Sequence, residues 1–401
     1  MAKHVIVIGA GVVGLACAWR LRRRGHRVTL LDPSPASGAS HAAAGMLAAV
    51  SEYYFEEESL LALSLPASRL YPQIIAELAR RTGGPTGFRD IPMIVATADS
   101  ADRERLEHLG DQQRSIGLTV TALTPSKARE MESFFSPRIS GAFLAEDDRQ
   151  VNPRVLAGAY LSDLEADEGC DVRPLAATEL LWRDGAVVGV RAAAVPGAEV
   201  FTHRFDERAV DTDEMTGDAP SWSSEDLPAG DSIDIAGLPE GLEWPIRPVY
   251  GDVIRLRTPE HLRPLLTRTV RGLVHGRSVY IVPREDGTIV IGATEREDGR
   301  DAVLGGGVLQ LLRDAQDLVP AVAELELVEA TARPRPGTPD NAPILGPIAP
   351  GLIADTGTYR HGILLSAQTA VVVADFVDGT AGQDEWAAFD PWRWSKQEAR
   401  A

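Results

Sequence analysis

Two arginine-bearing segments near the C-terminus carry side chains suited to holding an anion. The first reads Arg-Pro-Arg-Pro-Gly-Thr at residues 333–338, and the second reads Gly-Thr-Tyr-Arg-His-Gly at residues 357–362. A guanidinium offers two parallel N–H donors to a carboxylate, in a geometry that lysine cannot reproduce. The two segments therefore predict a site for an anionic ligand, with Arg335 and Arg360 as candidate binding groups.

A second set of candidate binding residues lies at the N-terminus. Residues 9–14, Gly-Ala-Gly-Val-Val-Gly, match the G-x-G-x-x-G pattern of dinucleotide-binding turns. In that pattern Gly9 permits the tight turn, Gly11 lets the backbone approach a pyrophosphate, and Gly14 lets the next helix pack on the sheet. Asp32 ends the following strand-like run, where its carboxylate can accept hydrogen bonds from ribose hydroxyls. The alternative is a tight turn that binds nothing. The residues predicted to contact the dinucleotide are Gly9, Gly11, Val12, Val13, Gly14 and Asp32.

A run of small residues after Asp32 bears on which dinucleotide binds. Residues 38–47 read Gly-Ala-Ser-His-Ala-Ala-Ala-Gly-Met-Leu, which leaves room for backbone contact with a bulky isoalloxazine ring. A small-residue loop beneath a helix would have the same composition. The run favours FAD over NAD and adds four expected contacts, namely Ser40, Ala44, Gly45 and Met46.

These side chains need elements that bring the two ends of the chain together. Residues 4–8 predict a buried parallel strand, residues 12–24 a helix that ends near Gly25, and residues 27–31 a second strand. Together they predict one βαβ unit that opens a doubly wound sheet. Residues 362–374 predict a helix that is either simply buried or directs its N-terminal dipole at the cofactor.

The remaining chain predicts a second domain, because 401 residues exceed the size at which one hydrophobic core keeps growing. The pattern predicts helices at 60–81 (interrupted at Pro66), 101–116 and 152–168, a helix start at Thr124, and strands at 91–97, 169–181, 185–191, 250–257, 278–283 and 288–293. The predicted fold class is α/β: a Rossmann-like FAD-binding domain with a doubly wound parallel sheet, and a second, mostly antiparallel α+β substrate domain. We assign residues 1–84, 147–240 and 327–401 to the FAD-binding domain, and residues 85–146 and 241–326 to the substrate domain.

Composition excludes several classes of partner. The chain carries 58 acids against 40 bases, and a net charge of -18 argues against binding nucleic acid or an anionic membrane. Cys17 and Cys170 form no C-x-x-C pair, so neither a redox dithiol nor a zinc site is expected, and a reducing cytoplasm fits. We expect no signal peptide, and no apolar run approaches the roughly 20 residues of a membrane span.

Several stretches, spread in order over nearly the whole chain, resemble the FAD-dependent D-amino-acid oxidase family of flavoproteins, and within it the glycine oxidases of thiamine biosynthesis. The stretches are residues 9–32, 42–46, 150–153, 280–284, 292–294, 335–338 and 360–365. The combination is far more specific than any one of them. The resemblance implies FAD as the cofactor, a small amine or amino acid as the substrate, and dioxygen as the electron acceptor.

The resemblance also assigns roles to single residues. Arg335 matches the arginine that grips the substrate carboxylate, Tyr280 the tyrosine that helps hold it, and Arg360 an arginine beside the active site. The alternatives are a surface arginine, an ordinary strand tyrosine and an arginine paired with an acid. Met46 is a candidate pocket wall, as is Tyr250. Further cofactor contacts are expected at Thr178, Thr358, Tyr359, Arg360, His361, Gly362, Ile363 and Leu364.

The implied reaction is oxidative deamination of glycine or a small amine or D-amino acid to the 2-oxo acid, ammonia and hydrogen peroxide. Such chemistry requires no protein base, so positioning carries the catalysis. Some relatives attach FAD through a histidine three residues before the loop glycine; His41 lies four before Gly45, so we predict noncovalent FAD. Relatives often assemble as homo-oligomers. The alternatives are a D-amino-acid dehydrogenase with another electron acceptor, and an FAD-binding protein without turnover.

One region departs from the family pattern. Residues 197–243 carry 13 acids against two arginines, a composition typical of an exposed insertion. Family members have an apolar strand here that ends in a small-residue turn, whereas residues 211–214 read Asp-Thr-Asp-Glu before Met-Thr-Gly. Four polar residues in a central strand are costly to bury. Three explanations are open: another segment takes the place of this strand, the region is rearranged around an acidic insertion, or the chain is a damaged copy in which FAD binding is weakened.

Overall fold

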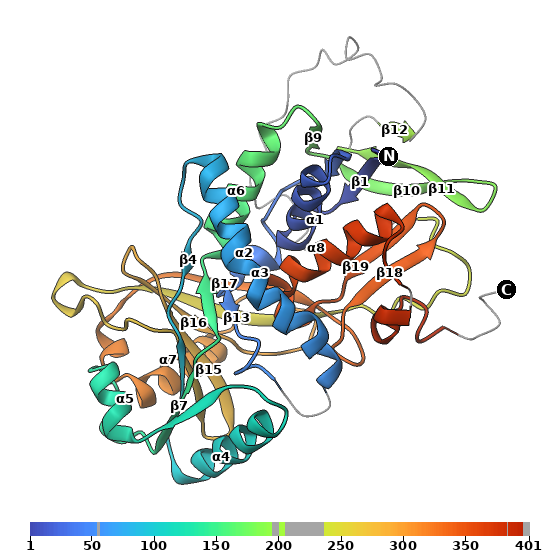
Figure 1. Ribbon diagram of the computed structural model, residues 1–401. Coiled ribbons are helices and arrows are strands. Elements are labelled where there is room, and N and C mark those ends of the chain that lie inside the picture. Colours follow the sequence, from blue (N-terminus) through green and yellow to red (C-terminus); the bar gives the residue numbers. More distant parts are fainter. Residues whose placement is uncertain (54–56, 195–199, 205–235, 383, 396–401) are drawn as a thin grey trace.

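The computed structural model of this protein describes residues 1–53, 57–194, 200–204, 236–382 and 384–395. A three-stranded parallel sheet with its helices lies at one end of the molecule, and a larger mixed sheet lies at the other (Figure 1). The C-terminal helix α8 (Gly362–Asp378) packs beside the N-terminal helix α1 (Val12–Arg23). The chain therefore returns to the domain in which it began.

The N-terminal βαβ unit forms where the apolar pattern predicts it. Strand β1 (His4–Ile8) pairs in parallel with β2 (Arg27–Leu31), and β2 pairs in parallel with β9 (Cys170–Arg173). The chain leaves α1 through Gly25, whose φ of +84° is one that glycine adopts without strain. These bounds agree with the prediction because an apolar run and a glycine after a helix are both local signals.

Four helices share one apolar core with this sheet: α1, α3 (Glu58–Thr82), α6 (Pro153–Glu165) and α8. Trp19 of α1 is buried there, and its ring meets that of Tyr160 edge to face at a centroid distance of 5.7 Å. The indole Nε1 donates to Asp163 Oδ2 at 2.8 Å, which satisfies the only polar atom of the buried ring. Side chains from two distant parts of the sequence, α1 and α6, thus fix how these two helices pack.

Helix α3 continues through Pro66 and Pro72, so the interruption predicted at Pro66 is wrong. A proline inside a helix costs about 3 kcal/mol, because it removes one hydrogen bond and crowds the preceding turn. The same helix buries an apolar face, and each such side chain contributes about 1.5–3 kcal/mol. Burial therefore outweighs the two prolines; the buried residues include Leu60, Leu63, Ala67, Tyr71, Ile74 and Leu78.

The second domain is built on an eight-stranded sheet in which all neighbours are antiparallel except β14 and β5. Its order is β17 (Glu326–Gly337), β13 (Arg247–Arg257), β16 (Thr288–Gly292), β15 (Arg277–Pro283), β14 (Val270–Val274), β5 (Met93–Thr97), β7 (Gly141–Ala145) and β6 (Val120–Leu123). The helices α4 (Ser100–Ser115), α5 (Pro125–Met131) and α7 (Gly305–Leu318) pack on it. The predicted mostly antiparallel second domain is confirmed.

Three smaller sheets and several short turns complete the described fold. Strands β3 (Met46–Leu47), β8 (Arg149–Val151) and β4 (Phe88–Arg89) form a short sheet, preceded by helix α2 (Ala39–Ala42). The other strands are β10 (Ala176–Arg183), β11 (Ala186–Ala193) and β12 (Val200–Arg204) in one meander, and β18 (Ile344–Ala349) and β19 (Leu352–Thr356) in a hairpin. Short 3-10 turns lie at Glu260–Leu262, Pro320–Glu324, Tyr359–His361 and Asp384–Phe389.

The pairing of β17 moves one predicted domain boundary. The division predicted from the sequence assigns residues 327–337 to the FAD-binding domain. In the structure, β17 pairs with β13 along nearly its whole length. By strand pairing these residues belong to the larger sheet, and the chain crosses to the first domain after Gly337. The rest of the two-domain division stays a prediction.

A cavity of about 1450 Å³ lies between β1 and the β18–β19 hairpin, and all five residues of β1 line it. Within the described parts of the chain, β1 has a sheet partner on one side only. The resemblance leads us to expect an apolar strand shortly before the second sheet domain. The residues predicted to depart from that pattern, 211–217, lie outside those that the structure describes.

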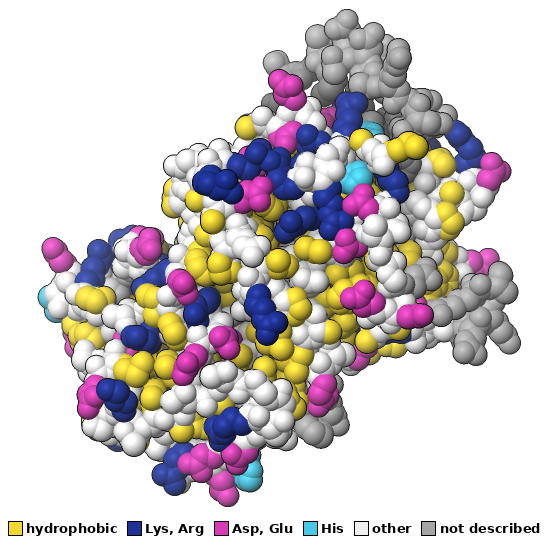
Figure 2. Space-filling model, in the orientation of Figure 1, with side chains coloured by type: hydrophobic (Ala, Val, Ile, Leu, Met, Phe, Trp, Pro, Cys, Tyr) yellow, Lys and Arg dark blue, Asp and Glu magenta, His cyan; other side chains and the backbone are white. Residues whose placement is uncertain are grey.

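Basic side chains gather over the upper part of the molecule in Figure 2, near α1, although the chain as a whole is acidic. The last turn of α1 is rich in arginine, and acids from other elements neutralise it: Asp167 contacts Arg22 and Arg23, while Asp375 and Asp378 contact Arg24. Arginines here also complement the negative end of the helix dipole. No helix in the described ranges has the length and hydropathy to cross a bilayer.

Candidate cofactor and substrate site

A cavity of about 980 Å³ runs between the two sheets and gathers both sets of residues singled out above. It begins at the turn before α1, passes the small-residue loop at residues 38–46, and ends against β13, β15 and β17. Its volume lies at the upper end of the range typical for small-molecule and cofactor sites, roughly 300–1,000 Å³. Parts of the chain more than 300 residues apart meet in its walls.

The glycine turn has the close packing that its pattern requires. A methyl group on Gly14 would overlap the carbonyl oxygen of Gly9, and Gly9 itself has a φ of +93°. Asp32 Oδ2 accepts a hydrogen bond from the Ala10 amide at 2.6 Å, which holds its carboxylate beside the turn. The Val12 amide donates to Ser40 Oγ at 3.0 Å, so the start of α1 and the small-residue loop are joined.

Three arginines hold the small-residue loop in place. Arg154 Nε and Arg255 Nη2 each donate to the His41 carbonyl oxygen at 2.9 Å, and Arg284 Nη2 donates to that of Ala44. Burial, followed by the nearby Arg255, lowers the pKa of Arg284 to about 9. Gly45 is required where the loop passes β8, because its φ is +75° and a methyl group would overlap the Val151 carbonyl oxygen. The sequence does not point to these arginines, since nothing local links them to the loop.

Arg335 and Tyr280 lie in the wall formed by the larger sheet. Arg335 Nη1 donates to the Thr294 carbonyl oxygen at 3.4 Å, and no carboxylate among the described residues pairs with this guanidinium. Tyr280 has a phenol close to this guanidinium: burial raises the pKa of Tyr280, and Arg335 partly offsets the rise. Gly292 leaves room for the phenol, because a methyl group there would overlap the Tyr280 ring and hydroxyl.

Arg360 also lines the cavity, but its charge is neutralised. Its Nη2 donates to Glu57 Oε1 at 2.8 Å and to Oε2 at 2.5 Å, and its guanidinium lies 5.3 Å from the Tyr359 ring centroid. An arginine held by an acid is the alternative that the sequence analysis left open for this residue. Arg335 is therefore the stronger candidate for binding a ligand anion.

Glu52 is a cavity residue that the sequence analysis missed. Its side chain is 11% exposed, and Glu52 Oε2 lies 3.7 Å from His361 Nδ1. Burial, Arg360 and Arg271 hold the pKa of His361 well below its usual value, so this imidazole is not a cation at neutral pH. The Glu52 carboxylate is close enough to Tyr280 to affect the pKa of that phenol. A signal existed in the sequence, since Glu52 is the first acid after the small-residue loop.

The cavity brings most of the predicted residues together. Those that line it are Gly11, Val12, Val13, Asp32, Ser40, Ala44, Gly45, Met46, Tyr280, Arg335, Thr358, Tyr359, Arg360, Gly362 and Ile363. Gly9 and Gly14 shape the turn behind the wall. His361 and Leu364 are buried beside it, and Tyr250 is buried away from it.

Thr178 does not lie where we expected. It is exposed on β10, and its hydroxyl donates to the Arg191 carbonyl oxygen at 3.1 Å. Ala176 lines the cavity instead. The two residues would share one face of a regular strand, but the register between β10 and β11 shifts between Ala177 and Glu179, so Thr178 lies at an irregularity that the sequence pattern does not show. His41 is also outside the lining; its side chain is 40% exposed and lies 3.9 Å from Glu329.

The residues present fit FAD. The turn supplies amides at a helix N-terminus for a pyrophosphate, Asp32 supplies a carboxylate for a ribose, and the loop at 42–46 supplies a small-residue wall for a flat ring. In the parts of the chain that the structure describes, no group of three or more His, Cys, Asp or Glu is arranged to hold a metal ion.

Comparisons with known proteins agree with this geometry. A family model described as FAD dependent oxidoreductase matches residues 4–376. A glycine oxidase from Geobacillus kaustophilus is 33% identical over 381 residues, which cover 93% of this chain and 92% of the relative. A bifunctional protein ThiO/ThiG from Trichormus variabilis is 30% identical over 387 residues; the match covers 94% of this chain and 53% of that longer protein.

The fold has a close counterpart among solved structures. The crystal structure of glycine oxidase from Geobacillus kaustophilus superimposes with a TM-score of 0.79 and 29% sequence identity, and the match covers 98% of this chain and 100% of that one. Both domains are therefore shared with that structure.

Proposed function

Because this chain belongs to the family of FAD-dependent oxidoreductases, we propose that it oxidises glycine, or an amino acid or amine of similar size, with FAD as a noncovalent cofactor. The proposed reaction converts glycine, dioxygen and water into glyoxylate, ammonia and hydrogen peroxide. The observation that carries the proposal is the guanidinium of Arg335, which faces the cavity without a carboxylate partner in the described chain.

Arg335 and Tyr280 form the carboxylate end of the proposed substrate site. Arg335 supplies two N–H donors in the fork geometry that a carboxylate accepts, and the Tyr280 hydroxyl supplies another donor from the same wall. A guanidinium in a partly enclosed site is desolvated and gains most from a ligand that returns a negative charge. This favours ligands that carry a free carboxylate.

Glu52 supports an amine at the other end of the substrate. It lines the same cavity, is nearly buried, and pairs with no lysine or arginine among the described residues. A substrate ammonium would supply that missing positive charge. Glu52 would then hold the substrate nitrogen through a charge-assisted hydrogen bond.

The walls next to these groups are apolar and exclude water. Ala44, Val253, Val282 and Val290 form a small buried cluster against which Met46, Tyr280 and Ala293 pack. Excluding water strengthens the contacts of Arg335 and Glu52 with a ligand, because the local dielectric falls. When bound, FAD supplies the electron acceptor; the protein holds the substrate in a single orientation for it.

Peroxide release from a panel of compounds tests the proposal. We expect peroxide from glycine, sarcosine or D-alanine, and none from glycolate or methylamine, each of which lacks one of the two charged ends. Turnover with an artificial electron acceptor but not with dioxygen would favour the alternative, a D-amino-acid dehydrogenase. FAD binding without turnover of any amine would contradict the proposal and favour a protein that has lost activity.

We place this reaction in thiamine thiazole biosynthesis in the cytoplasm, on the strength of the resemblance described above. The unpaired Cys17 and Cys170 are compatible with a reducing compartment. A strain lacking the gene would then require added thiazole for growth, and growth without it would contradict this placement.

A further inference from the structure

Arg335 lies in a space that one glycine keeps open. Strands β13 and β17 pair so that Val249 lies opposite Arg335, which puts Gly251 diagonally beside the arginine on the same face. A methyl group on Gly251 would overlap both terminal guanidinium nitrogens and would stand 2.6 Å from the Thr294 carbonyl oxygen. The φ of Gly251 is not in the left-handed region, so the backbone does not require glycine. Glycine is required here because the Arg335 guanidinium occupies the space that a side chain would fill.

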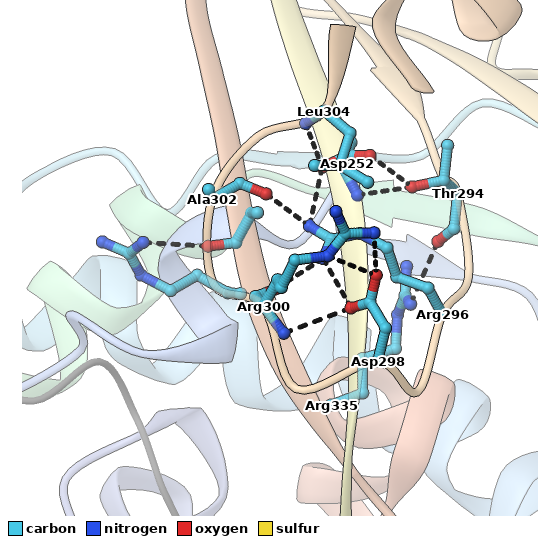
Figure 3. A network of polar contacts seen from close by, with 10 residues as sticks. Asp252, Thr294, Arg296, Asp298, Arg300, Ala302, Leu304 and Arg335 are labelled. Atoms are coloured by element: carbon cyan, nitrogen blue, oxygen red, sulfur yellow. Dashed lines mark hydrogen bonds and ion pairs between the residues drawn. The ribbon is translucent and has the colours of Figure 1, made fainter. Parts of the chain in front are cut away.

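The next residue, Asp252, fixes the segment against which Arg335 rests. Its carboxylate is 1% exposed and accepts hydrogen bonds from Thr294 Oγ1 at 2.8 Å and from Arg296 Nη2 at 3.1 Å. Its own amide donates to Thr294 Oγ1 at 2.8 Å, so Thr294 is held from two sides. The Leu304 amide adds a longer contact of 3.4 Å, which closes the loop at 294–304. Figure 3 shows this arrangement, with Arg335 reaching the Thr294 carbonyl oxygen.

The same network leaves Arg335 with its charge unmatched. Arg296 forms ion pairs with two carboxylates, those of Asp252 at 3.1 Å and of Asp298 at 3.0 Å. Burial works against the charge of Arg296, but these two carboxylates more than offset it and raise the pKa of Arg296. The buried acid nearest to Arg335 along β13 is therefore already neutralised. The positive charge of Arg335 remains for a ligand.

We propose that Gly251 and Asp252 position Arg335. Gly251 provides the space for its guanidinium. Asp252, through Thr294 and Arg296, fixes the Thr294 carbonyl group that orients the guanidinium. Asp252 is on this account a positioning residue, which does not touch the ligand. The inference rests on the proposed function only in taking the ligand of Arg335 to be a carboxylate.

The experiment uses the FAD-loaded protein and two readouts. Acetate, which has a carboxylate and no amine, is titrated while the flavin absorption spectrum is followed, and KM and kcat are measured with glycine. We expect Asp252→Asn and Gly251→Ala to raise both the acetate Kd and the glycine KM on the order of tenfold, because small displacements of a binding group weaken its contacts steeply. The kcat values should stay within about threefold of wild type, since the groups around the reacting bond are unchanged.

Three further variants separate positioning from folding. Thr294→Ser keeps the hydroxyl that Asp252 binds and should keep the wild-type acetate Kd, whereas Thr294→Val should behave like Asp252→Asn. Asp298→Asn removes only the outer, exposed acid of Arg296 and should change the Kd less than about twofold. Gly158→Ala, on the exposed face of α6 with open space around it, controls for adding a methyl group.

Two outcomes would overturn the inference: an unchanged acetate Kd in Gly251→Ala and Asp252→Asn, or a loss of melting temperature in both with no change in Kd or KM. If Asp252→Asn does not fold, Gly251→Ala and the two Thr294 variants still decide the question. Failure of the proposed function has a different signature, because acetate would still perturb the flavin spectrum of a wild-type protein that turns over no amine.

Discussion

Arg335 and Arg360 share one cavity, and what distinguishes them is the group that neutralises each. Glu57, 303 positions away along the chain, takes the charge of Arg360. Arg335 rests instead on a backbone carbonyl, which carries only a partial charge. The difference in charge decides which arginine is available to bind a substrate carboxylate.

Replacing Arg335 with lysine keeps the charge and removes the fork of N–H donors. We expect kcat/KM for glycine to fall about a hundredfold, which corresponds to roughly 3 kcal/mol, because a bidentate pair becomes a single contact. The matched control is Arg300→Lys, an exposed arginine in the loop of Figure 3 that pairs with Asp298. Equal activity of wild type and Arg335→Lys in steady-state kinetics would remove Arg335 from the substrate site.

Glu52 should matter for the amine and not for the carboxylate. We expect Glu52→Gln to raise the glycine KM on the order of tenfold, since a neutral amide loses the charge-assisted contact to an ammonium, while the acetate Kd stays within about twofold. Glu295→Gln is the control, because Glu295 also lines the cavity but is exposed and accepts from Tyr359. If both ligands weaken equally in Glu52→Gln, the carboxylate does not recognise the amine.

Among individual residues, the sequence predicts site residues that lie in local patterns. It does not predict those whose roles depend on distant partners. Arg335, Tyr280 and the glycine turn are predicted as site residues because each lies in a short recognisable stretch. Glu52 and the arginines around the small-residue loop are not, since their roles arise from contacts made by the folded chain. The same limit explains Arg360, whose partner no spacing in the sequence identifies.

Among the elements, the turn between β1 and α1 is the one on which cofactor binding depends most directly. Gly14→Ala places a methyl group against the Gly9 carbonyl oxygen, so helix α1 must move away from the strand that precedes it. We expect the purified variant to contain less than about a tenth of the wild-type FAD, because the pyrophosphate site lies in that turn. Absorbance at the flavin band relative to protein measures this, and Gly158→Ala should retain full FAD content. Full FAD content in Gly14→Ala would show that this turn does not bind the pyrophosphate.

Element bounds could be read from the sequence where the signal is local, as for β1, α1 and β2. Prediction failed at α3, where the apolar face of a 25-residue helix outweighs two prolines, a balance that only the packed core reveals. No strand is predicted at β17, whose apolar and polar residues do not show which sheet it joins. Strand pairing, and hence the domain boundary, is a property of the whole chain.

For the whole molecule, Glu329 on β17 links the two domains. It accepts from Arg154 of α6 at 2.6 and 3.0 Å and from Arg255 of β13 at 3.2 Å. Burial opposes its charge, but the hydrogen bonds from Arg154 and Thr331 and the nearby Arg255 more than offset this and lower the pKa of Glu329 to about 2. The group therefore stabilises the folded protein above the ordinary pKa of a glutamate, and this stability is lost as the pH falls toward about 2.

Glu329→Gln should lower the melting temperature at pH 6, and the difference from wild type should shrink as the pH falls from about 4.5 toward 2. Glu326→Gln on the same strand is the control, because its pair with Arg257 is long, at 3.8 Å, and exposed, so we expect almost no change. A difference between Glu329→Gln and wild type that stays constant with pH would mean that the charge of Glu329 does not contribute.

One spectroscopic experiment tests most directly whether the two sheets enclose a flavin and a small amine-bearing acid together. The purified protein is placed in an anaerobic cuvette, its absorption spectrum is recorded, glycine is added, and air is then admitted. We predict a flavin band that glycine bleaches and air restores, with release of hydrogen peroxide. A flavin band that neither glycine nor any small amine bleaches would contradict the proposed reaction, and a colourless protein that cannot be reconstituted with FAD would contradict the account of the cavity.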